Sequence, residues 1–333
     1  MMSKPFVYIT RRIPQVGLNL IAHECEMEIW DGELPPPRKV LLEKVKHAEG
    51  LLCLLTDRVN EELLNNAPKL KVVSNYAVGF DNIDVKEITL RKIPAGNTPD
   101  VLTDTTADLA FALLLSAARR IAEGDRFVRE GKWKTWGPTL LLGNDIHHAT
   151  LGIVGMGRIG QTVARRAKGF DMRIVYFDPK RCMEIEQDTG AISVDFRTLV
   201  GVSDFITIHT RLNDTSKNMF AEREFKLMKP TAVLINTARG PIVNSKDLYN
   251  ALKTGEISAA ALDVIDPEPI PVNDPLLTLD NCIIVPHIGS ASTQTRDKMA
   301  VMAANNLLAG LHGGRLPHCI NPEVYENLKK VFL

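Results

Sequence analysis

The sequence lacks the features that mark several classes of protein. Its 333 residues hold only five cysteines and no C-x-x-C pair, so it predicts neither a disulfide framework nor a zinc site. No apolar run approaches the roughly 18–20 residues that span a bilayer. The longest run, 109–118, contains a serine, and the N-terminus has no long apolar core typical of a secretory signal. We therefore expect a cytoplasmic protein without a membrane segment.

A charge imbalance is also lacking. Forty Lys and Arg residues balance forty Asp and Glu residues, which gives a formal net charge of zero. This balance argues against a strongly basic nucleic-acid-binding protein, although a local basic patch stays compatible with it. We expect no nucleic-acid partner. At about 150 residues per domain, the length indicates two domains.

What the sequence does contain is an alternation of apolar strands and amphipathic helices. Short apolar runs predict strands at 6–9, 50–55 and 71–74, and helix-like spacing occurs at 40–47 and 59–66. A second series of predicted strands follows at 151–154, 174–177, 205–208, 232–235, 259–262 and 283–285. Such alternation indicates parallel sheets, and the second series fits a complete dinucleotide-binding domain.

Two stretches connect or extend these series. The pattern predicts one long buried helix over 103–130. The next segment, 131–144, holds two of the three tryptophans and a run of three leucines, which is more typical of an interface arm than of a solvated loop. Packing against its own domain is the alternative. A last helix is predicted at 292–311, and it either closes the second domain or returns to the first.

A glycine-rich loop follows the strand at 151–154. Gly155, Gly157 and Gly160 form G-x-G-x-x-G at the start of a helical pattern. Such glycines permit a tight turn and close approach of the backbone to a pyrophosphate, and the helix N-terminus favours the anion. Asp178 ends the next strand, 18 residues after Gly160, where a carboxylate accepts hydrogen bonds from a ribose. A structural turn with a surface aspartate is the alternative.

Asp178 also bears on the choice of nucleotide. A carboxylate at this position repels a 2′-phosphate, so we expect NAD as the cofactor, with NADH preferred. Lys180 and Arg181 follow closely and reduce the preference, which leaves NADPH as the alternative.

Three ionisable side chains suited to catalysis follow later predicted strands: Arg239, Glu268 and His287. Ligands of open α/β sheets bind outside the carboxyl ends of the strands. Hydride transfer to a ketone leaves an alkoxide that a histidine can protonate, a carboxylate can stabilise the imidazolium, and an arginine can pair with a substrate carboxylate. Each residue taken alone has an alternative: His287 as a structural histidine, Glu268 as an exposed loop residue and Arg239 as part of a surface turn. His147 and His148 have no ligand partners at suitable spacing, so we expect no metal site.

At this point the sequence resembles a known family. The motifs at 155–160, 236–240, 266–269 and 286–290 together resemble the D-isomer-specific 2-hydroxyacid dehydrogenases, in order and spacing, over nearly the whole chain. Within that family the chain is most similar to the glyoxylate/hydroxypyruvate reductases. The supporting stretches lie at 98–108, 262–264 and 303–310.

The resemblance implies an α/β fold with two doubly wound parallel-sheet domains. Residues 1–100 and 291–333 would form a discontinuous, flavodoxin-like outer domain that binds the substrate. Residues 101–290 would form the inner, Rossmann NAD-binding domain, and the cleft would close on the substrate. It also implies a homodimer through the inner domain and the 131–144 arm. Several reductases of this family place a tryptophan of this arm in the partner's active site. The matching position in this sequence is Leu140.

The resemblance further implies roles for individual residues. His287 would be the proton donor, Glu268 its partner and Arg239 the cation that orients the substrate. The remaining implied cofactor contacts are Arg158 and Ile159 at the pyrophosphate, Thr237 and Ala238 along the nicotinamide, Asp263 at its carboxamide, and Thr106. The implied substrate contacts are the backbone N–H groups of Val78 and Gly79, together with Arg239, His287 and Ser290.

The resulting expectation is an oxidoreductase that reduces a small 2-keto acid, glyoxylate or hydroxypyruvate, to the 2-hydroxy acid, with the D-isomer formed where the product is chiral. D-3-phosphoglycerate dehydrogenase is one alternative, although Lys and Arg are sparse near 78–81. A non-catalytic, corepressor-like NAD(H) sensor is the other.

Overall fold

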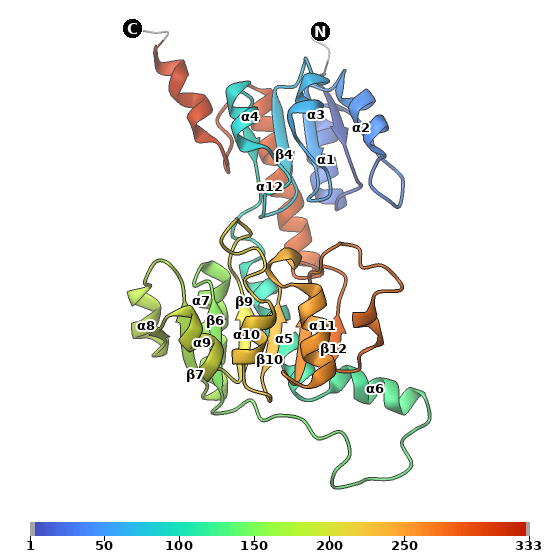
Figure 1. Ribbon diagram of the computed structural model, residues 1–333. Coiled ribbons are helices and arrows are strands. Elements are labelled where there is room, and N and C mark those ends of the chain that lie inside the picture. Colours follow the sequence, from blue (N-terminus) through green and yellow to red (C-terminus); the bar gives the residue numbers. More distant parts are fainter. Residues whose placement is uncertain (1–3, 331–333) are drawn as a thin grey trace. The chain divides into compact units, whose positions relative to one another are not determined.

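The computed structural model describes residues 4–330 and divides into two compact units (Figure 1). Unit 1 comprises the chain up to Leu102 and again from Ala291, and unit 2 comprises Thr103–Ser290. Residues 1–3 and 331–333 of the expected outer domain lie outside the described residues. Each unit contains a parallel sheet with buried apolar side chains on both faces, as sheets covered by helices on both sides require.

The sheet of unit 1 has the strand order β2-β1-β3-β4-β5, and all its strand pairs are parallel. This is the flavodoxin-like order. Its strands are β1 (Phe6–Ile9), β2 (Glu26–Ile29), β3 (Gly50–Cys53), β4 (Val72–Asn75) and β5 (Ala95–Gly96). The two strands that the sequence did not predict, β2 and β5, are the two edges of the sheet.

The C-terminal helix belongs to unit 1. The helices of this unit are α1 (Gln15–Glu24), α2 (Arg38–Val45), α3 (Glu61–Asn65), α4 (Val85–Leu90), α12 (Thr293–Leu311) and the 3₁₀ helix η4 (Pro322–Lys330). Helix α12 packs against α1 and β4. In the buried contact, Ser74 Oγ donates a hydrogen bond to the carbonyl oxygen of Ala303 at 2.8 Å. Of the two placements left open by the sequence, the return to the first unit is the one observed.

The sheet of unit 2 has the order β12-β11-β10-β9-β6-β7-β8, again with parallel pairs throughout. Its strands are β6 (Thr150–Val154), β7 (Arg173–Phe177), β8 (Ile192–Ser193), β9 (Phe205–Ile208), β10 (Val233–Asn236), β11 (Ala259–Leu262) and β12 (Cys282–Ile284). The chain starts at β6 in the middle and the order reverses between β6 and β9, which is the Rossmann arrangement. The predicted fold class is confirmed.

The helices of unit 2 correct one prediction. They are α5 (Thr103–Ala118), α6 (Ile121–Arg129), α7 (Arg158–Ala167), α8 (Met183–Thr189), α9 (Phe196–Val202), α10 (Glu222–Leu227) and α11 (Ser245–Thr254), with the 3₁₀ helices η1 (Lys168–Phe170), η2 (Gly240–Ile242) and η3 (Pro275–Thr278). The single helix expected over 103–130 is wrong. Arg120 adopts a left-handed backbone with φ of +51° and separates α5 from α6. Its guanidinium pairs with Glu123 in the first turn of α6, which stabilises the break.

The segment that the sequence predicts to be an interface arm follows α6. Residues 131–144 contain neither helix nor strand, and in Figure 1 they extend away from the rest of unit 2. Trp136 is 78% exposed and Leu142 64% exposed, and α6 itself has no buried residue. The side chains of Trp133, Leu140 and two further apolar residues of the segment, Trp136 and Leu142, are therefore exposed in the single chain. Among the described residues, no helix combines the length and the apolar character needed to cross a membrane.

Candidate active site

The glycine loop joins β6 to α7. Gly155 has φ of +95°, and a Cβ at this position would lie 2.7 Å from the carbonyl carbon of His209. A Cβ at Gly160 would lie 2.1 Å from the carbonyl oxygen of Gly155, so both positions require glycine. Gly157 differs, because nothing lies within 4 Å of the position its Cβ would take. The space beside Gly157 is where another group can approach the backbone closely.

This space lies at the N-terminus of α7. Gly157 is the N-cap residue and has no side chain that could cap the first N–H groups of the helix. Arg158 and Ile159 are the first two residues of α7 after this cap. The N–H groups at a helix N-terminus and the positive end of the helix dipole favour an anion such as a pyrophosphate. The loop therefore fits the phosphates of a dinucleotide.

Asp178, which follows β7, is fixed against the same loop. Its Oδ2 accepts a hydrogen bond from the backbone N–H of Met156 at 2.8 Å, and its Oδ1 accepts one from that of Lys180 at 2.8 Å. Met156 stands between Gly155 and Gly157. A carboxylate oxygen has two lone pairs, so Asp178 retains capacity to accept hydrogen bonds from ribose hydroxyls. The geometry fits the predicted nucleotide contact.

The turn after β10 carries three of the predicted site residues, and Asn236 fixes it. Asn236 Oδ1 accepts a hydrogen bond from the N–H of Ala238 at 3.0 Å, and its Nδ2 donates to the carbonyl oxygen of Arg239 at 2.9 Å. Nη1 of Arg239 donates to the carbonyl oxygen of Ala238 at 2.7 Å. Asn236 is fully buried, so the turn of Thr237, Ala238 and Arg239 is held from within the core.

Asp263, directly after β11, anchors the loop that follows His287. Its Oδ1 accepts a hydrogen bond from the N–H of Ile288 at 2.6 Å, and its Oδ2 accepts one from the N–H of Gly289 at 2.8 Å. Burial raises the pKa of this carboxyl, and the two N–H donors oppose that shift. Thr106 Oγ1 donates to the carbonyl oxygen of Gly289 at 3.1 Å. Both residues therefore contact the loop; their predicted contacts with a nicotinamide stay predictions.

His287 and Glu268 form a pair. Nδ1 of His287 lies 3.1 Å from each oxygen of the Glu268 carboxylate. His287 has φ of +52°, a left-handed conformation that is uncommon outside glycine, and its N–H donates to the carbonyl oxygens of Asp263 and Val285, each at 3.0 Å. A strained backbone that its surroundings hold in place is typical of functional sites. With Nδ1 facing the carboxylate, Nε2 is the ring nitrogen left to give a proton.

Sequence reasoning missed His209, which follows β9 where the strand order reverses. Thr207 Oγ1 lies 2.8 Å from its Nε2, and Thr237 Oγ1 lies 3.4 Å from its Nδ1. Burial lowers the pKa of His209 to about 3, so the ring is neutral at physiological pH. Its own N–H donates to the carbonyl oxygen of Val154 at 2.7 Å. The only signal in the sequence was a histidine at the end of an apolar strand.

The other predicted residues are placed as follows. Val78 and Gly79 lie in unit 1, in the loop after β4, and side-chain amides of Asn97 and Asn75 donate to their carbonyl oxygens at 2.8 and 2.9 Å. Ser290 is the last residue of unit 2. Among residues 4–330, no group of three or more His, Cys, Asp or Glu side chains is arranged to hold a metal ion.

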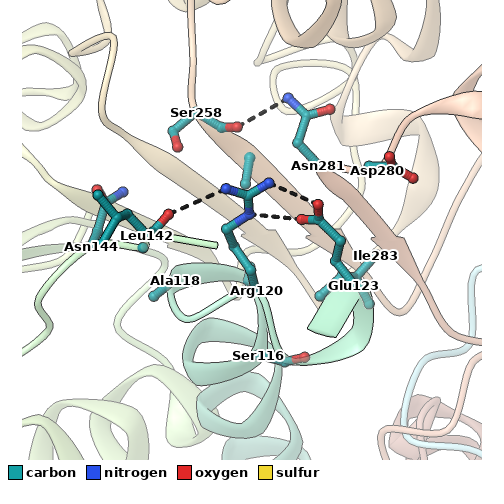
Figure 2. A pocket seen from close by; sticks show the side chains of 13 residues that line it. Ser116, Ala118, Arg120, Glu123, Leu142, Asn144, Ser258, Asp280, Asn281 and Ile283 are labelled. Carbon is teal, nitrogen blue, oxygen red and sulfur yellow. Dashed lines mark hydrogen bonds and ion pairs between the residues drawn. The ribbon is translucent and has the colours of Figure 1, made fainter. Parts of the chain in front are cut away.

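A cavity of about 300 Å³ lies in unit 2 at the amino ends of strands β11 and β12, whereas the residues after β11 and β12 discussed above follow the carboxyl ends (Figure 2). It is lined by the end of α5, the base of the arm and the residues at which β11 and β12 begin. Figure 2 shows Arg120 between Glu123 and the carbonyl oxygen of Leu142. Most of the predicted site residues of unit 2 follow the carboxyl ends of its strands, Thr106 lies on α5, and none of them lines this cavity. The cavity is separate from the predicted site.

A family comparison and a comparison with individual proteins point to the same family. The family described as "D-isomer specific 2-hydroxyacid dehydrogenase, NAD binding domain" matches residues 111–289. The glyoxylate reductase of Korarchaeum cryptofilum is 52% identical over 322 residues, which cover 96% of this chain and 97% of that protein. The chain therefore belongs to the D-isomer specific 2-hydroxyacid dehydrogenases, and the resemblance seen in the sequence is confirmed.

Solved structures agree with this assignment. A protein of Thermus thermophilus is 42% identical, with a TM-score of 0.89 over 95% of this chain and 99% of that chain. A glyoxylate reductase from Paecilomyes thermophila is 30% identical, with a TM-score of 0.84 over 97% of this chain and 100% of its own. The similarity covers both units of the fold.

Proposed function

We propose that this protein reduces a small 2-keto acid of the glyoxylate type to the 2-hydroxy acid, with the D-isomer formed where the product is chiral. Family membership and relatives named glyoxylate reductase support the reaction class. The observation that carries the proposal is the His287–Glu268 pair. Glu268 and His287 follow the carboxyl ends of β11 and β12, and the glycine loop follows the carboxyl end of β6 in the same sheet. Nδ1 of His287 lies 3.1 Å from each carboxylate oxygen of Glu268.

The chemistry follows from these residues. When bound, reduced nicotinamide supplies the hydride to the carbonyl carbon of the substrate. His287 gives the proton from Nε2 to the oxygen that becomes the hydroxyl, and Glu268 stabilises the imidazolium at Nδ1. Arg239 pairs with the substrate carboxylate and polarises the carbonyl. Each group acts where charge develops as the carbonyl is reduced.

The cofactor and substrate contacts proposed are those expected from the sequence. Gly155, Gly157, Gly160, Arg158 and Ile159 would hold the pyrophosphate, and Asp178 the ribose. Thr106, Thr237, Ala238 and Asp263 would hold the nicotinamide end. The backbone N–H groups of Val78 and Gly79 would bind the substrate carboxylate, and Ser290 would be a further substrate contact. Support comes from the open space at Gly157 and from the fixed position of the Asp178 carboxylate.

NADH is the proposed preferred nucleotide. Asp178 presents a carboxylate where the ribose would bind, and a 2′-phosphate would meet that negative charge at close range. NADPH stays the alternative. Dissociation constants for NADH and NADPH, measured by titration of nucleotide fluorescence, test the preference directly.

We also propose a homodimer through unit 2 and the 131–144 arm. Exposed apolar side chains of this size, on a segment that extends from its unit, are typical of a surface that another chain covers. Whether Leu140 reaches a partner's site stays a prediction, as does the cytoplasmic location.

An absorbance assay at the reduced-nicotinamide band tests the function. Glyoxylate, hydroxypyruvate, pyruvate and 3-phosphohydroxypyruvate would each be offered with NADH and with NADPH. We expect fast oxidation with one of the first two. Fastest turnover of 3-phosphohydroxypyruvate would instead favour a phosphoglycerate dehydrogenase, and tight nucleotide binding without turnover would favour a sensor.

A further inference from the structure

An arginine beside the proposed ribose contact is held in an ion pair. Arg181 lies in the loop between β7 and α8, three residues after Asp178. Its Nε lies 2.9 and 3.1 Å from the two carboxylate oxygens of Glu186, and its Nη2 lies 2.8 Å from Oε2. This two-point arrangement is the strong form of an arginine–carboxylate pair.

Glu186, the partner, is fixed by the core. The hydroxyl of Tyr176 donates a hydrogen bond to Glu186 Oε1 at 2.7 Å and accepts one from the N–H of Cys182 at 2.8 Å. Tyr176 lies on β7 and is fully buried. The side chain of Glu186 is only 15% exposed, whereas that of Arg181 is 67% exposed. The carboxylate is therefore the anchored member of the pair, and the guanidinium is drawn to it.

The pair also sets the local charge. Hydrogen bonds from Arg181 and from Tyr176 lower the pKa of Glu186, and the hydrogen bond to Glu186 raises the pKa of Arg181. Both groups stay ionised, so they neutralise one another. A 2′-phosphate carries about −1.5 to −2 charges near neutral pH, and a guanidinium is the side chain that best binds such a group. Arg181 has the right chemistry for that role, but two of its three nitrogens already face a carboxylate.

We propose that Glu186 is a specificity-determining residue, which disfavours 2′-phosphorylated nucleotides by keeping Arg181 in an ion pair. The inference rests on the proposed function, since it assumes that a nucleotide ribose binds at Asp178. Two carboxylates then act together. Asp178 repels the 2′-phosphate directly, and Glu186 removes the cation that would otherwise compensate.

The test measures binding of nucleotides in place of turnover. Glu186→Gln keeps the shape of the side chain and a hydrogen-bond acceptor for Tyr176 but removes the charge. Glu184→Gln is the matched control, because it removes the same charge from the same helix α8 without touching the pair. Each would be made alone and together with Asp178→Ser. The probes are NADH, NADPH and 2′,5′-ADP, which carries the 2′-phosphate without nicotinamide.

We expect Glu186→Gln to lower the dissociation constants of NADPH and 2′,5′-ADP by about three- to tenfold, because one partly exposed charge contact is gained. The dissociation constant of NADH should change by less than about twofold. The gain should be larger in the Asp178→Ser background. An unchanged NADPH-to-NADH ratio in both backgrounds would overturn the inference, as would an equal gain from Glu184→Gln. If the unmutated protein binds neither NADH nor NADPH, the proposed function fails, and this inference fails with it.

Discussion

Nδ1 of His287 lies 3.1 Å from each carboxylate oxygen of Glu268, and the backbone of His287 is held in a left-handed conformation to reach that position. The carboxylate holds the ring by one nitrogen. The other nitrogen, Nε2, is the proposed contact with a substrate oxygen. This relationship gives the first two predictions.

Replacing His287, the proposed proton donor, should slow catalysis strongly but preserve nucleotide binding. Asparagine tolerates left-handed backbone better than most residues, so His287→Asn is the least disruptive change. We expect kcat with glyoxylate to fall by about 10²–10⁴, the range that general acid catalysis contributes. The dissociation constant for NADH should stay within about twofold. Loss of NADH binding in this variant would refute the assignment.

Removing the charge of Glu268 should have a smaller effect. Glu268→Gln keeps a hydrogen-bond acceptor beside Nδ1 but cannot neutralise an imidazolium. We expect kcat to fall by about ten- to a hundredfold, less than for His287→Asn, with KM little changed. Steady-state kinetics over a range of pH measure this. A kcat equal to that of the unmutated protein at every pH would contradict the pairing.

Asp178 should control the nucleotide. Asp178→Ser removes the carboxylate that faces the proposed ribose site and keeps a small polar side chain. We expect the ratio of kcat/KM for NADPH to that for NADH to rise by at least about tenfold, because one close charge repulsion is lost. An unchanged ratio would show that Asp178 does not contact the ribose.

His209 should make the stability of the protein depend on pH. Its pKa is lowered to about 3 in the folded protein, from an ordinary value of 6.5. Between these values the unfolded chain binds a proton that the folded protein does not, so the free energy of unfolding falls as the pH is lowered. The slope is about 1.4 kcal/mol per pH unit for one proton. Denaturant unfolding of His209→Gln should show a shallower decline over this range, and an identical decline would contradict the burial argument.

The arm should be needed for assembly and not for folding. Trp136→Ser with Leu142→Ser replaces exposed apolar side chains, so we expect the fold of each chain to survive while a dimer dissociates. Sedimentation velocity measures the change. A monomeric unmutated protein would contradict the proposed dimer outright.

The sequence predicted the elements that carry strong local signals. The glycine loop, Asp178 and the residues after β10, β11 and β12 could be located because buried parallel strands are nearly continuous apolar runs, and site residues follow their ends. Strand β2 was missed because its glutamates break the apolar run, and β5 and β8 because each has only two residues. All three are edge strands, each paired with a single neighbouring strand.

Other features depend on tertiary contacts that no local pattern contains. Arg120, at the break between α5 and α6, also donates a hydrogen bond to the carbonyl oxygen of Leu142, 22 residues further along the chain. His209 acquires its neutral state through burial beside Thr237, the residue that follows β10. The pairing of Arg181 with Glu186 depends on a tyrosine hydroxyl from β7. The sequence indicates only that Arg181 is a cation close to Asp178. The fold shows that Arg181 is paired with Glu186.

The central claim is that a hydride passes from nicotinamide to the carbonyl carbon of a 2-keto acid. The most direct test is to incubate the purified protein with glyoxylate and NADH deuterated at both C4 positions, and to examine the product by NMR. We predict glycolate with one carbon-bound deuteron at C2 for each NADH oxidised. Glycolate without carbon-bound deuterium, or no glycolate from protein that binds NADH, would contradict the account.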